Sequence, residues 1–495
     1  MNRQIRLVGL GLLVCFAVLF VQLNRLQFFE RSELEENPLN TRDIVRDFGE
    51  PRGDILTIDG EIVATTVDVG GQLRRERQYP FGELFAHVTG YFSFDFGADG
   101  VERIYNDELA GQTAGQQFGS FADLFRDNDT TGDLVLTLDA TVQEAARAAL
   151  GDRNGSVVVM DPRDGSIVAL WSFPSYDPGP LSGTDLAVAR AAREALLDDP
   201  TKPDLARSYR ERYPPGSTFK IVTASAGLSS GIVGLADPVF PAVAEYVPPL
   251  TTVPITNFRG SICGGALPEI LRVSCNTAFA EMGAEVLGPE VMVETAEDFG
   301  FNDAPPVDLP AAAESVFPTD FERDIPRLAQ SSIGQNDVAA TPLQMALATA
   351  AIANGGVIME PHVMDRIVAA DGDIIDEWGA RSWRRALREV DAATMRELMI
   401  GVVEAGTATS MAIPGVVVGA KTGTAQTTAS DGGTADDTHA WLVAFAGPAE
   451  GPAELVVAVI VEAVPGGGEQ TGGGVAAPVA RAVLEAAIAA GGVGG

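Results

Sequence analysis

The sequence has little positive charge and almost no lysine. Its 495 residues include 68 Asp and Glu but only 34 Lys and Arg, which gives a formal net charge of −34 at pH 7. This balance argues against nucleic acid as a partner, because binding to phosphates requires basic patches. Arginine supplies all the basic residues except Lys202, Lys220 and Lys421. A lysine can lose its proton when burial or a neighbouring cation lowers its pKa, whereas arginine cannot, so each lysine is a candidate for chemistry.

Histidine and cysteine are equally scarce, with three residues of each. The histidines, His87, His362 and His439, are scattered along the chain, and no cluster of His, Cys and Asp has the spacing of metal ligands. We therefore expect neither a metal nor another cofactor.

Long hydrophobic stretches are also rare. One runs from Leu7 to Val21 without a charge and continues amphipathically to about Phe29, which reaches the roughly 20 residues that a spanning helix needs. No cleavage site of small residues follows, so residues 7–29 are predicted to be an uncleaved signal anchor, with a cleaved signal peptide as the alternative. The arginines of residues 1–6 should stay in the cytoplasm. No later segment reads as a span, so we expect a single-pass plasma-membrane protein with its large domain outside.

The rest of the chain divides into two regions. Residues 30–130 can form only a small domain, a pedestal, in which "PRGDILTIDGEIVATT" predicts two short strands around an Asp59-Gly60 turn. Residues 131–495 begin with a strand and a hairpin and end with three strands and a helix, with helical segments between them. That order predicts one antiparallel sheet built from both ends and covered by helices, an α+β fold.

The stretch "YPPGSTFK" contains one of the three lysines. Pro214, Pro215 and Gly216 interrupt regular structure, and the following "STFKIVTASAGL" predicts a helix. Ser217 then lies in the first turn, with Lys220 three residues later on the same face. A hydroxyl beside an amine of lowered pKa is an activated nucleophile, and a helix N-terminus stabilises an oxyanion that forms there.

Two further polar motifs follow in the sequence. "RVSCNTAF" provides Ser274 and Asn276, and "KTGTAQ" provides Lys421, Thr422, Gly423 and Thr424 at the end of a predicted strand. The lysine and hydroxyls of the second motif can bind an anion, and its glycine lets a ligand approach the backbone closely. Each motif is weak alone. The order S-x-x-K, S-x-N, K-T-G is the pattern of the penicillin-recognising serine transferases and β-lactamases.

From residue 50 onward the chain resembles the class B penicillin-binding proteins and is most similar to the PbpA-like D,D-transpeptidases of high-GC Gram-positive bacteria. "PRGDILTIDGEIVA" and "GVERIYNDELAG" are similar to that family's N-terminal region, and "VVMDPRDGSIVALWSFPSYDP" to the start of its transpeptidase domain. The family usually has Gly-Gln-Gly where this chain has Gly334-Gln335-Asn336. The resemblance implies a pedestal or dimerisation-like domain over residues 30–130. It also implies a penicillin-binding transpeptidase domain over residues 131–495, with an antiparallel five-stranded sheet flanked by helices, as in serine β-lactamases.

The resemblance also implies roles for the residues of the first two motifs. Ser217 would attack the carbonyl between the two terminal D-alanines of a peptidoglycan stem peptide, and Lys220 would take its proton. Ser274 would relay a proton to the leaving amine. Asn276 would hold Lys220 and the substrate amide.

The third motif would bind the end of the substrate. Lys421, with the hydroxyls of Thr422 and Thr424, would bind the terminal carboxylate, and Lys421 would keep Lys220 neutral by repulsion. The backbone N–H groups of Ser217 and Thr424 would form the oxyanion hole. β-Lactam antibiotics would acylate the same serine, and a membrane glycosyltransferase of the elongation or division machinery would be a partner.

The two cysteines outside the anchor are predicted to form a disulfide. Cys263 and Cys275 are the pair in the exterior part of the chain, and a Gly-rich turn and a short helix between them allow the chain to fold back. The bridge requires a Cα separation of about 4.4–6.8 Å. It would fix the backbone that carries Ser274 and Asn276; the alternative is two independent thiols.

Three other functions fit parts of the sequence. A β-lactamase would need a residue that activates water, and Glu314 in "AAAESVF" lacks the neighbouring Asn expected of one. A bifunctional synthase would need a glycosyltransferase domain, for which the roughly 100 residues between the anchor and the second region are too few. A non-catalytic penicillin-binding sensor or divisome scaffold would keep the binding site and lack turnover.

Overall fold

The structure is a computed structural model and describes residues 2–25, 48–70, 73–113, 116, 130–321, 324–427, 437–449 and 451–492. The first helix, α1 (Asn2–Asn24), contains residues 7–24 of the predicted anchor, and its described apolar side chains are exposed, with Leu7 and Phe20 at 63% and 68%. Residues 26–29 of the predicted anchor lie outside the described residues. An exposed apolar helix of this kind requires an apolar environment to cover it.

The expectation that no later segment is long and apolar enough to span a membrane is wrong, because one later stretch meets both conditions. The stretch Gly472–Gly491 has 20 residues and a mean hydropathy of 1.4. Most of it is helix α18 (Ala477–Ala487), whose buried side chains include Val479, Val483 and Leu484. These side chains face the interior and α18 packs on strands and on another helix, so its hydrophobicity is explained by the core of the folded domain.

A six-stranded sheet brings together distant parts of the sequence. Its order is β15-β14-β6-β1-β2-β3. The strands are β1 (Ile55–Leu56), β2 (Ile62–Asp68), β3 (Arg75–Gln78), β6 (Gly132–Leu136), β14 (Met364–Ala369) and β15 (Ile374–Glu377). The expected hairpin around Asp59-Gly60 is present, with β1 antiparallel to β2.

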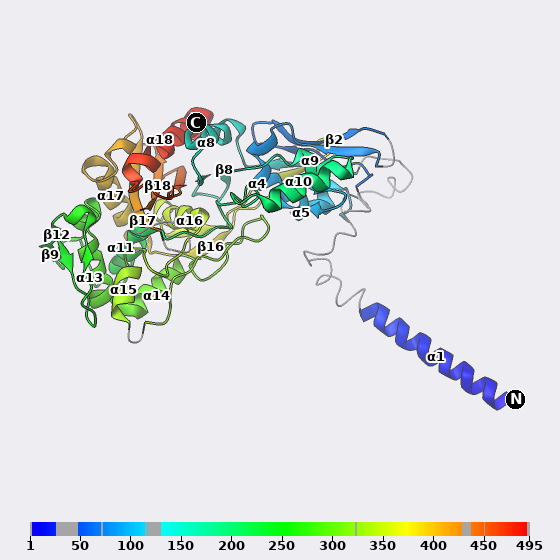
Figure 1. Cartoon of the computed structure of the whole chain (residues 1–495), viewed down its shortest axis with the longest axis horizontal. Helices are drawn as coiled ribbons and strands as arrows, with labels where there is room; N and C mark the ends of the chain where they lie inside the picture. The colour runs from blue at the N-terminus through cyan, green and yellow to red at the C-terminus, as the bar shows by residue number, and fades with distance from the viewer. Residues whose placement is uncertain are drawn as a thin grey trace.

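The predicted division of the chain at residue 130/131 does not coincide with the edge of this sheet. Strand β6 pairs with β1 on one side and β14 on the other, although both β6 and β14 fall in the predicted second region. These pairings bury Leu134 and Ile367, so apolar burial draws two parts of the second region into the first sheet. Helix α9 (Gly179–Ser182) packs on β3, and Figure 1 shows α9 and α10 (Leu186–Asp198) beside α4 (Ala86–Thr89).

The predicted α+β fold is confirmed by a second, five-stranded sheet. Its order is β17-β18-β19-β7-β8, and every pair of neighbours is antiparallel. The strands are β7 (Gly155–Met160), β8 (Ile167–Phe173), β17 (Val417–Gln426), β18 (Thr438–Gly447) and β19 (Leu455–Val461). The sheet is therefore built from both ends of the second region, as the strand order in the sequence indicates.

Both faces of this sheet are covered by helices. Strands β18 and β19 are buried at every position, which explains why their sequences are continuously apolar instead of alternating. Helices α8 (Ala140–Leu150) and α18 pack on each other and on the sheet, and so do α16 (Pro342–Ala353) and α17 (Glu389–Ala405). The remaining larger helices are α11 (Lys220–Ser229), α12 (Leu267–Arg272), α13 (Asn276–Glu281), α14 (Gly288–Asp298) and α15 (Ile325–Ser331).

Short elements complete the described chain. The two-stranded pairs are β4 (Phe92–Ser93) with β5 (Gly97–Ala98), β9 (Phe240–Val243) with β12 (Cys263–Gly265), β10 (Glu245–Tyr246) with β11 (Ile255–Thr256), and β13 (Val357–Met359) with β16 (Ser382–Arg385). The N-terminal helices are α4 (Ala86–Thr89), α5 (Gly100–Ile104) and α6 (Asn106–Leu109).

A buried ion network joins the two N-terminal motifs. Arg52 of "PRGD" and Arg77 of β3 contact opposite oxygens of Glu102 in "GVERI", at 2.7 and 2.6 Å. Burial alone would raise the pKa of the Glu102 carboxyl, but Arg77 and Arg52 hold it below its usual value. Replacing Glu102 by Gln would leave two buried guanidinium groups without a counter-charge, which is strongly destabilising.

Candidate active site

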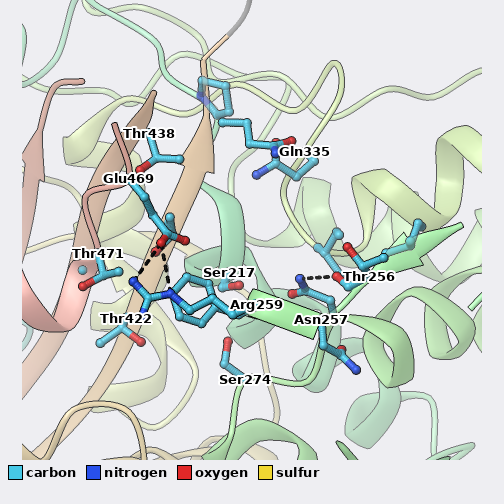
Figure 2. A pocket seen from close by; sticks show the side chains of 18 of the residues that line it. Ser217, Thr256, Asn257, Arg259, Ser274, Gln335, Thr422, Thr438, Glu469 and Thr471 are labelled. Carbon is cyan, nitrogen blue, oxygen red and sulfur yellow. Dashed lines mark hydrogen bonds and ion pairs between the residues drawn. The ribbon is translucent and has the colours of Figure 1, made fainter. Parts of the chain in front are cut away.

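A cleft of about 870 Å³ contains residues from all three sequence motifs. Ser217, Ser274, Asn276, Thr422 and Thr424 all line it. Figure 2 shows Ser217, Ser274 and Thr422 around this space, each from a different part of the chain. The fold thus brings together side chains that lie up to 207 positions apart in the sequence.

Ser217 lies in a tight turn at the base of α11. Residues Gly216–Phe219 form a 3₁₀ turn that leads directly into α11, so the expected helix start is present with a tighter first turn. Gly216 has φ +53°, and a Cβ there would lie 2.6 Å from the carbonyl oxygen of Thr424. Glycine is therefore required for the serine to approach the strand that carries the third motif.

Lys220 is fully buried and points its amine at the second motif. Its Nζ donates to the Ser274 carbonyl oxygen at 2.8 Å and to Asn276 Oδ1 at 2.6 Å, and lies 3.3 Å from Ser274 Oγ. Burial, and then repulsion from Lys421, holds the pKa of Lys220 well below its usual value. Within the described chain the amine contacts these groups and makes no hydrogen bond to Ser217 Oγ, a contact that often tightens only when substrate binds.

Lys421 contacts Ser274 as well. Its Nζ donates to Ser274 Oγ at 2.8 Å and to the Thr422 carbonyl oxygen at 2.9 Å. Burial lowers the pKa of Lys421 to about 7. The Ser274 hydroxyl consequently contacts two amines whose pKa values are both lowered by burial.

The third motif presents hydroxyls along an edge strand. Thr422 and Thr424 on β17 line the cleft, and Thr422 Oγ1 is 2.7 Å from Thr407 Oγ1. Strand β17 is at the edge of its sheet, so alternate backbone N–H groups are free to bind a ligand. This edge can accept an extended peptide with a terminal carboxylate.

A disulfide links Cys263 of β12 to Cys275, with the Cα atoms 5.8 Å apart. That separation lies inside the predicted range. Cys275 directly precedes α13, and the first residue of α13 is Asn276. The bridge therefore connects the small β9–β12 sheet to the start of the helix that holds the Lys220 amine.

Several cleft residues were not identified from the sequence. Arg259 donates to Glu469 Oε2 at 2.9 Å across the cleft, an ion pair that Figure 2 shows as dashed lines. The two residues come from separate loops without a motif, and nothing in their local sequence indicates that they meet. Asn336, which the sequence shows in place of the second glycine of Gly-Gln-Gly, also lines the cleft, with φ +62°. Asn is the side chain most tolerant of this left-handed backbone after Gly, so it can replace the second glycine of Gly-Gln-Gly.

Two residues weighed in the sequence lie apart from the cleft. Lys202 is exposed, in keeping with its lack of a motif. Glu314 is also exposed and is not among the described residues that line the cleft, so it is not placed to activate water for deacylation.

Known proteins are similar to this chain over almost its whole length. The penicillin binding protein transpeptidase domain family matches residues 155–485, and the penicillin binding protein A dimerisation domain family matches residues 52–135. Peptidoglycan D,D-transpeptidase PbpA of Mycolicibacterium smegmatis is 38% identical, over 99% of both chains.

Solved structures are similar in fold as well as in sequence. Penicillin-binding protein A from M. tuberculosis, as its ceftriaxone acyl-enzyme complex, superposes with a TM-score of 0.81 at 35% identity, over 90% of this chain and 100% of that one. The penicillin G acyl-enzyme complex of the same protein gives a TM-score of 0.79 at 34% identity, over 89% and 100%.

Proposed function

The chain belongs to the penicillin-binding protein transpeptidases, and on that basis we propose that it cross-links peptidoglycan stem peptides through an acyl-enzyme on Ser217. The observation that carries the proposal is the convergence of two buried lysine amines on one serine hydroxyl at the edge of the cleft. Buried amines of lowered pKa are the groups that can take up and deliver protons at neutral pH.

Acylation begins with the nucleophile. Ser217 Oγ attacks the carbonyl between the two terminal D-alanines, and its proton passes to the neutral amine of Lys220. The N–H groups of Ser217 and Thr424 stabilise the oxyanion of the tetrahedral intermediate. When the C–N bond breaks, the leaving D-alanine amine receives a proton through the hydroxyl of Ser274, which lies between the two lysines.

Transfer reverses these steps with a new amine. An amino group from a second stem peptide attacks the ester carbonyl of the acyl-enzyme, gives up one proton through the Ser274 hydroxyl to Lys220, and forms the cross-linking amide. Ser217 Oγ leaves as the alcohol and recovers a proton from Lys220. Acylation and transfer thus use the same groups in opposite directions.

Recognition of the donor substrate is assigned to the third motif. The ammonium of Lys421 and the hydroxyls of Thr422 and Thr424 bind the terminal carboxylate. A bound carboxylate favours the charged form of Lys421, so binding of the substrate would raise the pKa of this lysine from about 7. A β-lactam carries a comparable carboxylate and a reactive carbonyl, so it acylates the same serine.

Anchoring and partnership are further parts of the proposal. The exposed apolar side chains of α1 support its insertion in the plasma membrane with the two domains outside. Neither matched region, 52–135 or 155–485, is a glycosyltransferase. A separate membrane glycosyltransferase would therefore supply the glycan strands to be cross-linked.

A synthetic pentapeptide ending in D-Ala-D-Ala distinguishes this enzyme from a non-catalytic sensor. The purified chain should release D-alanine and, with an acceptor amine, form a cross-linked product, while Ser217→Ala should do neither. Acylation of wild type by penicillin without any release of D-alanine would support the sensor instead.

A further inference from the structure

The proposed oxyanion hole is assembled from two elements that are not adjacent in the sequence. One N–H donor is on the turn Gly216–Phe219 and the other on β17. A donor pair stabilises an oxyanion only when both N–H groups point at the same atom. The relative placement of the turn and the strand must therefore be fixed by other residues.

Trp441 connects these two elements. It lies on β18 directly opposite Gly423 of the third motif, and it is fully buried. Its indole Nε1 donates to the carbonyl oxygen of Pro214 at 3.0 Å, three residues before Ser217. Trp441 therefore lies beside Gly423, next to the proposed donor Thr424. Its indole is hydrogen-bonded to the segment that leads to the other proposed donor, Ser217.

The contact between the turn and the strand has little free space. A Cβ on Gly423 would lie 2.8 Å from Trp441 Cβ, 2.9 Å from Thr218 Cγ2 and 3.0 Å from the Pro215 carbonyl oxygen. Atoms that close cannot shift independently. A hydrogen bond at this position can therefore set the distance between the two donors.

The residue before Pro214 is also held. Tyr213 donates its hydroxyl to Glu462 Oε1 at 2.6 Å, and its ring packs edge-on to Trp441 at 6.2 Å between centroids. Its backbone N–H donates to the Ala340 carbonyl oxygen at 2.9 Å. With the chain fixed up to Tyr213, the indole N–H is the contact that orients the next peptide unit toward β18.

We propose that the indole N–H of Trp441 is a positioning group that aligns Ser217 with Thr424 for acylation. This inference rests on the proposed function and adds a residue to it. The competing explanation is that Trp441 only fills the core. The same sheet offers a control, because Trp171 on β8 is also buried but its indole nitrogen has no hydrogen-bond partner among the described residues.

The test compares tryptophan replacements in the otherwise intact chain. Trp441→Phe keeps an aromatic ring and removes the N–H, and 3-benzothienylalanine at position 441 keeps the full shape and removes only the N–H. For each, stopped-flow acylation by a fluorescent penicillin separates the rate constant for acylation from the constant for initial binding. We expect acylation to slow about tenfold while initial binding stays within about twofold, because the carboxylate site is unchanged. Trp171→Phe should change neither constant by more than about twofold.

Each outcome decides a different point. Acylation within about twofold of wild type in both position-441 replacements would overturn the inference, and so would an equal loss in Trp171→Phe. If Trp441→Phe does not fold, the benzothienyl replacement decides, and failure of that replacement to fold would assign the N–H to folding instead of alignment. Failure of the wild-type chain to be acylated at Ser217 would overturn the proposed function and this inference together.

Discussion

Two of the three lysines meet at a single hydroxyl, and the proposed role of Lys220 as a base explains why arginine could not replace that lysine. Both Lys220 and Lys421 contact Ser274 Oγ, and burial is the largest cause of the lowered pKa at each. Arginine keeps its charge at any working pH and could not exchange a proton there. We therefore propose that lysine is used where a side chain must take up a proton, while arginine supplies most of the other basic residues.

Replacing Lys220 by arginine should abolish acylation although the positive charge is kept. Without a base to accept the Ser217 proton, we expect the acylation rate constant for penicillin to fall by at least about 100-fold. Stopped-flow labelling measures it, with Lys202→Arg as the matched control, because that lysine is exposed and should behave as wild type. A Lys220→Arg variant labelled within about tenfold of wild type would show that the lysine acts only through its charge.

Lys421 makes the reaction sensitive to pH. Because its pKa is about 7, raising the pH through 7 removes the ammonium that we propose binds the carboxylate. The second-order rate constant for acylation should therefore decline on the alkaline side, starting near pH 7. In Lys421→Arg the cation persists and the alkaline decline should disappear, whatever the absolute rate. A wild-type rate constant that keeps rising to pH 9 would exclude this role.

The motif residues could be predicted from the sequence, whereas the residues from loops could not. Ser217, Ser274 and Thr422 belong to three motifs whose order along the chain predicts that they share one site. Arg259 and Glu469 lie 210 positions apart on loops, and only the assembled fold brings them together. Their ion pair is exposed and is expected to contribute little to stability. Neither residue belongs to a motif, so the local sequence does not indicate that they meet.

Most strands and turns could be predicted from local patterns in the sequence, with two exceptions. The hairpin of β7 and β8 and the three strands β17, β18 and β19 could be predicted from the sequence, whereas the strand predicted at the start of the second region, β6, belongs to the six-stranded sheet. The pairing of β14 with β6 could not be predicted, since it joins segments more than 200 residues apart. This pairing is determined by which apolar side chains become buried in the folded sheet. The turn at Ser217 is 3₁₀ where an α-helix was expected, because Gly216 must pack against Thr424.

Removing the disulfide should destabilise the domain. The Cys263–Cys275 bridge closes a 12-residue separation, for which the chain-entropy model gives about 3 kcal/mol. The double variant Cys263→Ser/Cys275→Ser should lose that much free energy of unfolding in denaturant titrations. Cys15→Ser, which changes the free cysteine of α1, should leave it unchanged. A double variant within about 0.5 kcal/mol of wild type would mean that the bridge adds no stability.

The complete chain combines an acidic exterior, an exposed apolar helix at its start and an apolar helix in its core. The charge of −34 favours solubility of the domains, and the two apolar helices differ in what covers them. α1 is exposed, whereas α18 packs on the sheet and on α8. By length and composition Gly472–Gly491 is the stronger candidate for a span, although α18 packs in the core, because hydropathy does not take the burial of a helix into account.

Deleting residues 1–30 tests which helix is the anchor. We expect the truncated chain to be soluble without detergent and to bind penicillin as the full chain does, because the cleft and its helices are retained. Fractionation of cells that express each form, followed by penicillin labelling, measures both properties. The full chain should sediment with membranes; a truncated chain that also sediments while still labelled would identify α18 as the membrane-binding helix.

Covalent labelling with a fluorescent penicillin, followed by digestion and peptide mapping, tests the central claim most directly. The adduct should fall on Ser217 in the peptide that contains "YPPGSTFK" and on no other residue. Ser217→Ala should lose all label. Its melting temperature should be unchanged, since the substitution removes only one oxygen from a half-buried side chain that lines the cleft. An adduct on Ser274, or label retained by Ser217→Ala, would contradict the account.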